Sequence, residues 1–159
     1  MPVNSVIRFS DASLIAVHAL AALASDPERR IQGRDLAEAM GASGNHLAKV
    51  MQRLVRARLV LSVKGPLGGF SLARDPSEVS ILDAISAVDG PMAVDFCPFR
   101  PDRCDPSQCV FGKEVSKHAG DLVEYLGRRT IADILREGRP RFQPPVREPR
   151  TRAVRLARG

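Results

Sequence analysis

The apolar and polar positions of this chain predict a series of helices interrupted by one pair of short strands. ASLIAVHALAALA, which follows Ser10, is almost continuously apolar and predicts a largely buried helix over about 11–25. GRDLAEAMG predicts a short second helix between Gly33 and Gly41. A third helix begins near Ser43, where apolar residues recur at i, i+3, i+4, i+7 and i+8 and therefore share one face. These residues are Leu47, Val50, Met51, Leu54 and Val55.

A β-hairpin is predicted after the third helix. LVLSV and FSLA are typical of short strands, and the turn KGPLGG between them is rich in Gly and Pro. Helix, helix, turn, helix and hairpin is the element order of a winged helix-turn-helix. We therefore expect residues 1–76 to form a winged helix-turn-helix DNA-binding domain, and the whole fold to be mainly α with a small β-hairpin.

The second half of the chain returns to helical spacing. SILDAISAVDG predicts a helix with Ser80 and Asp83 at capping-box spacing, and Thr130 and Asp133 repeat this spacing before IADILREG. VSKHAGDLVEYLG places apolar residues at alternating spacings of four and three, a narrow seam that favours a long dimerisation helix. A core-facing helix in a monomer would look similar. The seam residues are Val115, Ala119, Leu122 and Leu126.

Charge is distributed unevenly along the chain, whose net charge is +6. Residues 139–159 contain seven Arg and one Glu, whereas residues 1–138 balance 17 basic against 17 acidic side chains. The terminal segment is rich in Pro and Arg and poor in large apolar residues, so we expect a disordered tail. Contact of its arginines with nucleic-acid phosphates is the alternative interpretation.

Several classes of protein are disfavoured by what the sequence lacks. It has no apolar run of about 18 residues, so we expect no membrane span. The N-terminus lacks the layout of a secretory signal, which makes the reducing cytoplasm the expected compartment. No nucleophile–base constellation occurs, and KGPLGG lacks the Gly-Lys-Ser/Thr ending of a phosphate loop. We therefore expect neither enzymatic activity nor a small-molecule substrate.

The third helix and the hairpin carry the features of an interface with double-stranded DNA. Six basic residues and no acidic ones occur from Ala39 to Arg74. Polar side chains on the third helix lie largely off its apolar face, where they can reach base edges in the major groove. A solvated helix face and an ordinary hairpin are the alternative. The expected DNA-contacting residues are Ser43, Asn45, His46, Lys49, Gln52, Arg53, Lys64, Gly68 and Gly69.

All three cysteines lie in the thirteen-residue stretch CPFRPDRCDPSQC, at Cys97, Cys104 and Cys109. Its three prolines exclude a regular helix, so we expect a loop that can wrap around a centre. Three converging thiolates suit Zn²⁺ or an iron–sulfur cluster, and either would need a fourth ligand from outside the loop. Free or redox-active thiols without a metal are the other possibility.

These stretches together resemble one known family. RFSDASL, SGNHLAKVMQRLVRARLVLSVKGPLGGFSLAR, VSILDAISAVDGP and the cysteine loop before a long helix are similar to the Rrf-two-type iron–sulfur winged-helix regulators, the IscR/NsrR/RirA family. The resemblance runs from Val6 to Gly138. RGxxGG at the wing is a family hallmark, and here it is KGPLGG with Lys64 in the Arg place. NHLAKV is most similar to the NsrR branch.

The resemblance implies a homodimer that binds a DNA operator under the control of an iron–sulfur cluster, expected to be [4Fe-4S] rather than [2Fe-2S]. The three cysteines would hold the cluster, which makes residues 77–138 the cluster-binding loop and dimerisation helices. In the NsrR branch an aspartate contributed across the dimer completes the cluster, and Asp11 stands at the matching place. Asp11 would otherwise complement the helix dipole. IscR-like members instead use a histidine at the position taken here by Gly112.

The signal implied by this resemblance is nitric oxide, iron or redox state. A zinc-stabilised or thiol-redox winged-helix regulator without a cluster would share the fold but would show no visible absorbance. An iron–sulfur carrier or a protein–protein adaptor would lack steeply salt-dependent affinity for DNA. These three alternatives stay open at the level of sequence.

Overall fold

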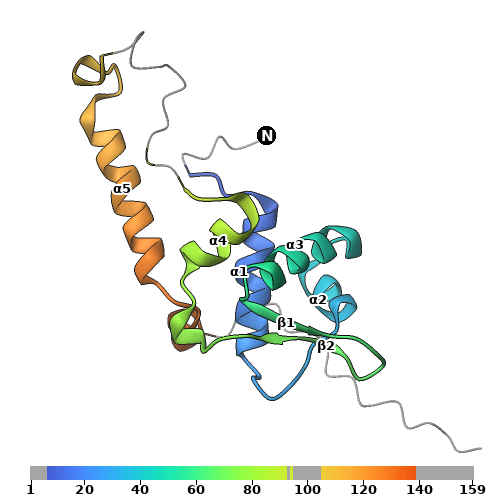
Figure 1. Ribbon diagram of the computed structural model, residues 1–159. Helices are drawn as coiled ribbons and strands as arrows, with labels where there is room; N and C mark the ends of the chain where they lie inside the picture. The colour runs from blue at the N-terminus through green and yellow to red at the C-terminus, as the bar shows by residue number, and fades with distance from the viewer. Residues whose placement is uncertain (1–6, 93, 95–104, 139–159) are drawn as a thin grey trace, which may run out of the picture.

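The computed structural model of the protein describes residues 7–92, 94 and 105–138. These residues form six α-helices and one antiparallel hairpin, which confirms the predicted fold class (Figure 1). In chain order the elements are α1 (Asp11–Ala24), α2 (Gly33–Met40), α3 (Gly44–Arg56), β1 (Val60–Val63), β2 (Gly69–Leu72), α4 (Ile81–Asp89), α5 (Gly112–Arg128) and α6 (Ile131–Glu137). Short 3₁₀-helices, Pro76–Glu78 and Pro106–Gln108, precede α4 and α5.

Helix α1 lies at the centre of the hydrophobic core. Ser10 caps it, since the Ser10 hydroxyl accepts a hydrogen bond from the Ser13 amide at 3.0 Å. Every residue from Ala19 to Ala24 is buried. Helices α2, α3, α4 and α6 and strand β2 all contact α1. The almost continuous apolar run of this helix is explained by these neighbours, which cover most of its surface.

Helices α2 and α3 form the helix-turn-helix. Gly41 follows α2 with a φ of 61°, in the left-handed region that glycine adopts without strain. Ser43 then caps α3, since its hydroxyl accepts a hydrogen bond from the His46 amide at 3.2 Å. The predicted apolar face of α3 is confirmed, with Val55 half-buried and the other four residues buried.

The hairpin forms the wing. Strands β1 and β2 pair antiparallel, from Val60 opposite Leu72 to Val63 opposite Gly69. Ile31, in the linker between α1 and α2, forms an isolated bridge with Phe70 of β2. The Ile31 amide donates to the Phe70 carbonyl at 2.9 Å, and the Phe70 amide donates to the Ile31 carbonyl at 2.8 Å. The wing is thereby fastened to the segment that precedes the helix-turn-helix.

Helices α4 and α6 begin with the capping boxes that the sequence predicts. At Ser80 and Asp83, and again at Thr130 and Asp133, the N-cap hydroxyl and the acidic side chain each accept from the other residue's amide. A β-bridge joins Ser80 to Thr130. Ile131 is fully buried in the same core as α1. The core therefore continues past residue 76, and the division of the chain into domains stays a prediction.

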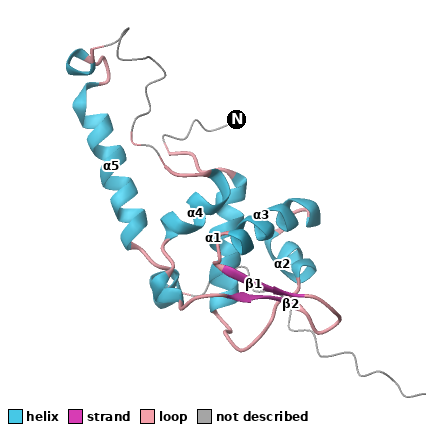
Figure 2. Cartoon of the chain, viewed as in Figure 1, coloured by secondary structure: helices cyan, strands magenta, loops and turns pink. Residues whose placement is uncertain are grey.

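Helix α5 lies on the opposite side of α1 from α2, α3 and the tip of the hairpin (Figures 1 and 2). It begins at Gly112, earlier than the predicted seam. Leu126 is buried, and α5 contacts α4. Val115 and Tyr125 remain 41% and 53% exposed. A single chain therefore leaves part of the apolar surface of α5 uncovered.

Candidate nucleic-acid interface

Helix α3 presents a polar face opposite its buried residues. Asn45, Lys49 and Gln52 are exposed, and Arg56 continues the same row toward the end of the helix. Spacings of four, three and four residues place these side chains on one face of an α-helix. The core holds the other face of α3, so this row is available to a partner.

Two of the expected contact residues also shape the start of α3. Ser43 is exposed although its hydroxyl caps the helix, and His46, whose amide is the donor to that cap, is half-buried. The first turn of a recognition helix is the part that reaches base edges. The cap therefore fixes the direction of the turn that would approach DNA.

Arg53 has an intramolecular partner that the sequence did not indicate. Its guanidinium donates a hydrogen bond to the backbone carbonyl of Val88, in the last turn of α4. Carbonyls in the last turn of a helix lack intrahelical donors, so a side chain can satisfy them. Arg53 is exposed, yet it already links α3 to α4.

The wing depends on glycine at two neighbouring positions. A Cβ on Gly68 would lie 2.2 Å from the Val63 carbonyl oxygen, a distance that backbone atoms do not tolerate. Gly69 has a φ of 142°, and a Cβ there would lie 2.7 Å from the Ile31 carbonyl oxygen. The backbone of the wing thus requires glycine at both positions, independently of the predicted contact with DNA. Lys64 is exposed beside them.

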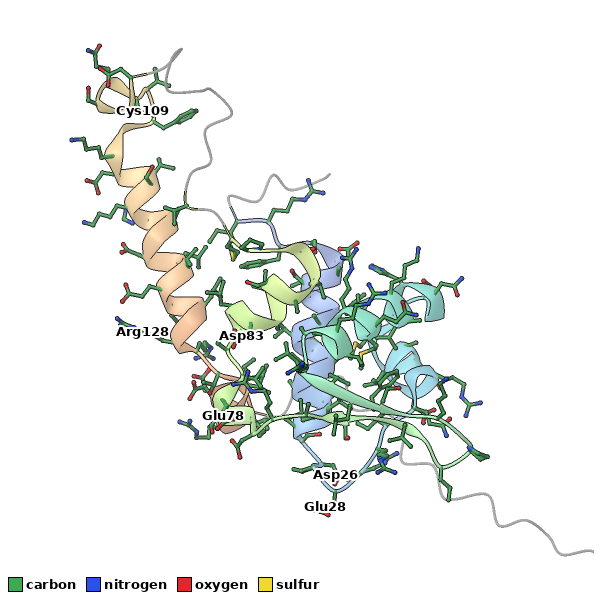
Figure 3. The ribbon with its side chains drawn as sticks, viewed as in Figure 1. Asp26, Glu28, Glu78, Asp83, Cys109 and Arg128 are labelled. Atoms are coloured by element: carbon green, nitrogen blue, oxygen red, sulfur yellow. The ribbon has the colours of Figure 1, made fainter. Side chains whose placement is uncertain are left out.

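The cysteine segment is described only in its last part. Cys97 and Cys104 lie outside the described residues, whereas Cys109 is a free, half-buried cysteine shortly before α5. Among the residues that the structure describes, no group of three or more His, Cys, Asp or Glu is placed to hold a metal ion. Figure 3 shows Cys109 at the end of α5 that lies away from α1. Asp11 is the first residue of α1 and is exposed.

Asp105, between the second and third cysteines, is already engaged. Its carboxylate accepts hydrogen bonds from the Ser107 hydroxyl at 2.7 Å and the Ser107 amide at 2.9 Å. The hydrogen bond from the Ser107 hydroxyl lowers the pKa of Asp105 most, and the hydrogen bond from the Ser107 amide lowers it further. These contacts shape the 3₁₀ turn that leads into α5.

A polar junction that sequence reasoning missed joins the ends of α1 and α4. One carboxylate oxygen of Asp89 accepts hydrogen bonds from the hydroxyls of Ser10 and Ser13, both at 2.6 Å. Ser13 is buried, with an exposed fraction of 1%. Asp89 is the last residue of α4, directly before the chain runs toward the cysteines, and Ser10 is next to Asp11. The one signal for this contact in the sequence is the small polar residue Ser13 within the apolar run of α1.

A helix-turn-helix with a polar helix face beside a glycine-rich wing defines a winged-helix DNA-binding protein. The chain matches the Rrf2 model, described as an iron-dependent transcriptional regulator, over residues 9–137. It belongs to this family of transcriptional regulators. No helix within the described ranges is long and apolar enough to cross a membrane.

Two relatives illustrate the membership. BadM of Rhodopseudomonas palustris, assigned as an HTH-type transcriptional regulator, is 41% identical over 80 residues, which are 50% of this chain and 51% of BadM. This chain thus spans about half the length of BadM. A protein of Aquifex aeolicus, also assigned as an HTH-type transcriptional regulator, is 31% identical over 130 residues, which are 80% of this chain and 90% of that protein.

Two solved structures share the fold. IscR of T. potens superposes with a TM-score of 0.65 at 27% identity, covering 83% of this chain and 88% of that one. CymR, the global cysteine regulator of B. subtilis, superposes with a TM-score of 0.68 at 19% identity, covering 82% and 98%. These matches agree with the predicted family. They do not single out the NsrR branch, which stays a prediction.

Proposed function

We propose that the protein is a homodimeric regulator that binds an operator in double-stranded DNA through α3 and the wing. The observation that carries this proposal is the exposed row of Asn45, Lys49 and Gln52, opposite the buried face of α3 and accompanied by Lys64 on the wing. Amide side chains pair with adenine, and lysine pairs with guanine or phosphate. The absence of acidic residues from 39 to 74 adds an electrostatic attraction to DNA.

Helix α5 supplies the surface for the proposed dimer. Val115 and Tyr125 stay exposed in one chain, and α5 lies away from the DNA-facing helices (Figure 1). Pairing of α5 with its copy would cover this apolar surface and would leave both α3 helices free. Two recognition helices held at a fixed separation read two half-sites of one operator.

The donor set of the cysteine segment fits an iron–sulfur cluster. Cys97, Cys104 and Cys109 would supply three thiolates, and Asp11 of a second chain would supply the fourth ligand. The family description as iron-dependent supports this assignment. When bound, a [4Fe-4S] cluster with one carboxylate ligand offers an iron that nitric oxide or oxygen can attack.

The chain's own residues connect this segment to the DNA-binding surface. Asp89 holds the start of α1, beside Asp11, through Ser10 and Ser13. Arg53 of α3 donates a hydrogen bond to the carbonyl of Val88, the residue before Asp89 in α4. Both contacts meet in the last turn of α4, from which the chain continues toward Cys97. Movement of the cysteine segment would therefore displace a turn that touches both α1 and α3.

The test begins with the full-length protein purified without oxygen. A broad visible absorption band with about four irons per chain, together with sulfide, is the expected result for the cluster. The same protein then enriches duplexes from a random-sequence DNA library, and anisotropy measures the affinity for the enriched duplex before and after nitric oxide. Cys97→Ala, Cys104→Ala and Cys109→Ala should each abolish the band and the response.

Each component of the proposal has a contrary outcome. A colourless protein that contains zinc, or no metal, and still binds the duplex would indicate a zinc-stabilised or thiol-redox regulator. Cluster-containing protein that enriches no DNA sequence would indicate an iron–sulfur carrier or an adaptor instead. Three cysteine variants with unchanged affinity and unchanged response to nitric oxide would remove the sensing role of the segment.

A further inference from the structure

A leucine at the tip of the wing is presented to solvent. Leu67 is 83% exposed, far more than Leu61 and Val63 on the neighbouring strand, which are 54% and 40% exposed. Single exposed leucines are common on protein surfaces, so exposure alone indicates no function. The position and the rigidity of Leu67 are what distinguish it.

The tip that carries Leu67 is held from several directions. The Gly68 amide donates to the Gly65 carbonyl at 2.9 Å, which closes a tight turn around Pro66 and Leu67. Gln32, the residue before α2, donates from its side-chain amide to the Pro66 carbonyl at 3.2 Å. Gly68 has no room for a Cβ, so only glycine fits the turn at this position. Leu67 is therefore displayed in a fixed direction at small entropic cost.

Leu67 also borders an open depression between the wing and the α1–α2 linker. Pro27, Glu28 and Arg30 of the α1–α2 linker line this open depression of about 480 Å³ together with Leu67 and Ser71 of the wing. Figure 3 shows Glu28 in the linker that follows α1. Arg30 can attract a phosphate there, whereas Glu28 would repel it. The two side chains would therefore have opposite effects on the binding of a phosphate strand in this depression.

We propose that Leu67 contacts the minor groove of operator DNA as an apolar wedge, with the flanking phosphate strand passing Arg30. This inference rests on the proposed binding of DNA and names the residue that reads the flanks of the operator. Minor-groove proteins insert leucine and similar side chains against base steps and thereby favour sequences that deform easily. Pyrimidine–purine steps are the most flexible, so we expect them enriched at the wing positions of the operator.

The experiment compares the full-length wild type with Leu67→Ser and Leu67→Met in duplex enrichment from a random-sequence library. All three proteins should select the same central half-sites, because α3 is unchanged. Wild type and Leu67→Met should also select flexible steps in the flanks. Leu67→Ser should lose this flank preference and bind the wild-type duplex about tenfold more weakly. Circular dichroism and urea unfolding should show that the exposed substitution leaves the fold intact.

Substitutions of Arg30 and Glu28 provide an independent test with the same duplex. Arg30→Gln should weaken binding and reduce the salt dependence of the affinity, and Glu28→Gln should strengthen binding. Wild-type protein that enriches no duplex would overturn the proposed DNA binding itself. Wild-type enrichment with identical flanks and affinity for Leu67→Ser would overturn only the wedge. Unchanged affinity in both charge variants would overturn the path of the phosphate strand.

Discussion

Arg53 of α3 donates a hydrogen bond to the carbonyl of Val88 at the end of α4. A basic residue on the helix expected to read DNA is thus tied to the turn that leads to the cysteine segment. The next residue, Asp89, binds two serines of α1. One turn of α4 therefore contacts the helix expected to bind DNA and the helix that begins with the candidate ligand Asp11.

Substitution of Arg53 should affect stability, whereas substitution of Lys49 should affect DNA binding. Arg53→Met removes the donor to Val88 and should cost about 1 kcal/mol in the free energy of unfolding. Lys49→Met should leave stability unchanged and lower the slope of log affinity against log salt by about one per subunit. Urea unfolding and anisotropy titrations over a salt series separate the two effects. A reduced salt slope for Arg53→Met at wild-type stability would instead place Arg53 on a phosphate.

The junction at Asp89 makes a prediction about the buried hydroxyl of Ser13. Asp89→Ala leaves this hydroxyl without its carboxylate acceptor and should destabilise the fold by about 1–3 kcal/mol. Adding Ser13→Ala should recover part of this loss, because the hydroxyl is then absent. Urea unfolding of the two single variants and the double variant measures their coupling. Glu28→Ala, at an exposed linker position, is the control, and strictly additive effects would contradict the junction.

The sequence predicted the elements well because their signals are local. Ser80 with Asp83 and Thr130 with Asp133 form capping boxes between residues three positions apart, and both pairs occur as predicted. The apolar face of α3 follows from a repeat within thirteen residues. Such patterns need no knowledge of the tertiary structure, since propensity, capping and periodicity act within one element.

The contacts between elements could not be predicted in the same way. Asp89 is 76 positions from Ser13 and Arg53 is 35 positions from Val88, and neither pair forms a sequence motif. Arg53 therefore looked like any other basic residue of α3. The sequence predicts that Gly68 and Gly69 contact DNA, and the structure gives them a steric role against Val63 and Ile31 as well.

Acid should weaken the attachment of α6 to the rest of the core. Hydrogen bonds from the Thr130 amide and, to a smaller extent, from the Thr130 hydroxyl lower the pKa of Asp133. A hydrogen bond from the Arg129 side chain lowers the pKa of Glu137. A carboxylate with a lowered pKa in the folded state adds stability above its unfolded pKa, and this contribution is lost as the pH falls through the folded value. Stability should therefore decline below about pH 4.

Asp133→Ala isolates this contribution. The variant should be less stable than wild type at neutral pH, and the difference should shrink as the pH falls through the lowered pKa of Asp133. Urea midpoints at several pH values measure the difference. Asp26→Ala, at an exposed position, should follow the wild-type curve. A difference that stays constant across the pH range would show that Asp133 acts through packing rather than through its charge.

The wing should fail when its tightest glycine gains a side chain. Gly68→Ala places a Cβ 2.2 Å from the Val63 carbonyl oxygen and 2.8 Å from the backbone carbon of Lys64, so the turn must open. Gly44→Ala, at a helical position with no atom within 4 Å of the new Cβ, should leave stability equal or slightly higher. Because the turn lies at the tip, Gly68→Ala should lower DNA affinity more than it lowers the free energy of unfolding. Anisotropy and urea unfolding on both variants test this order, and wild-type affinity in Gly68→Ala would show that the wing does not contact DNA.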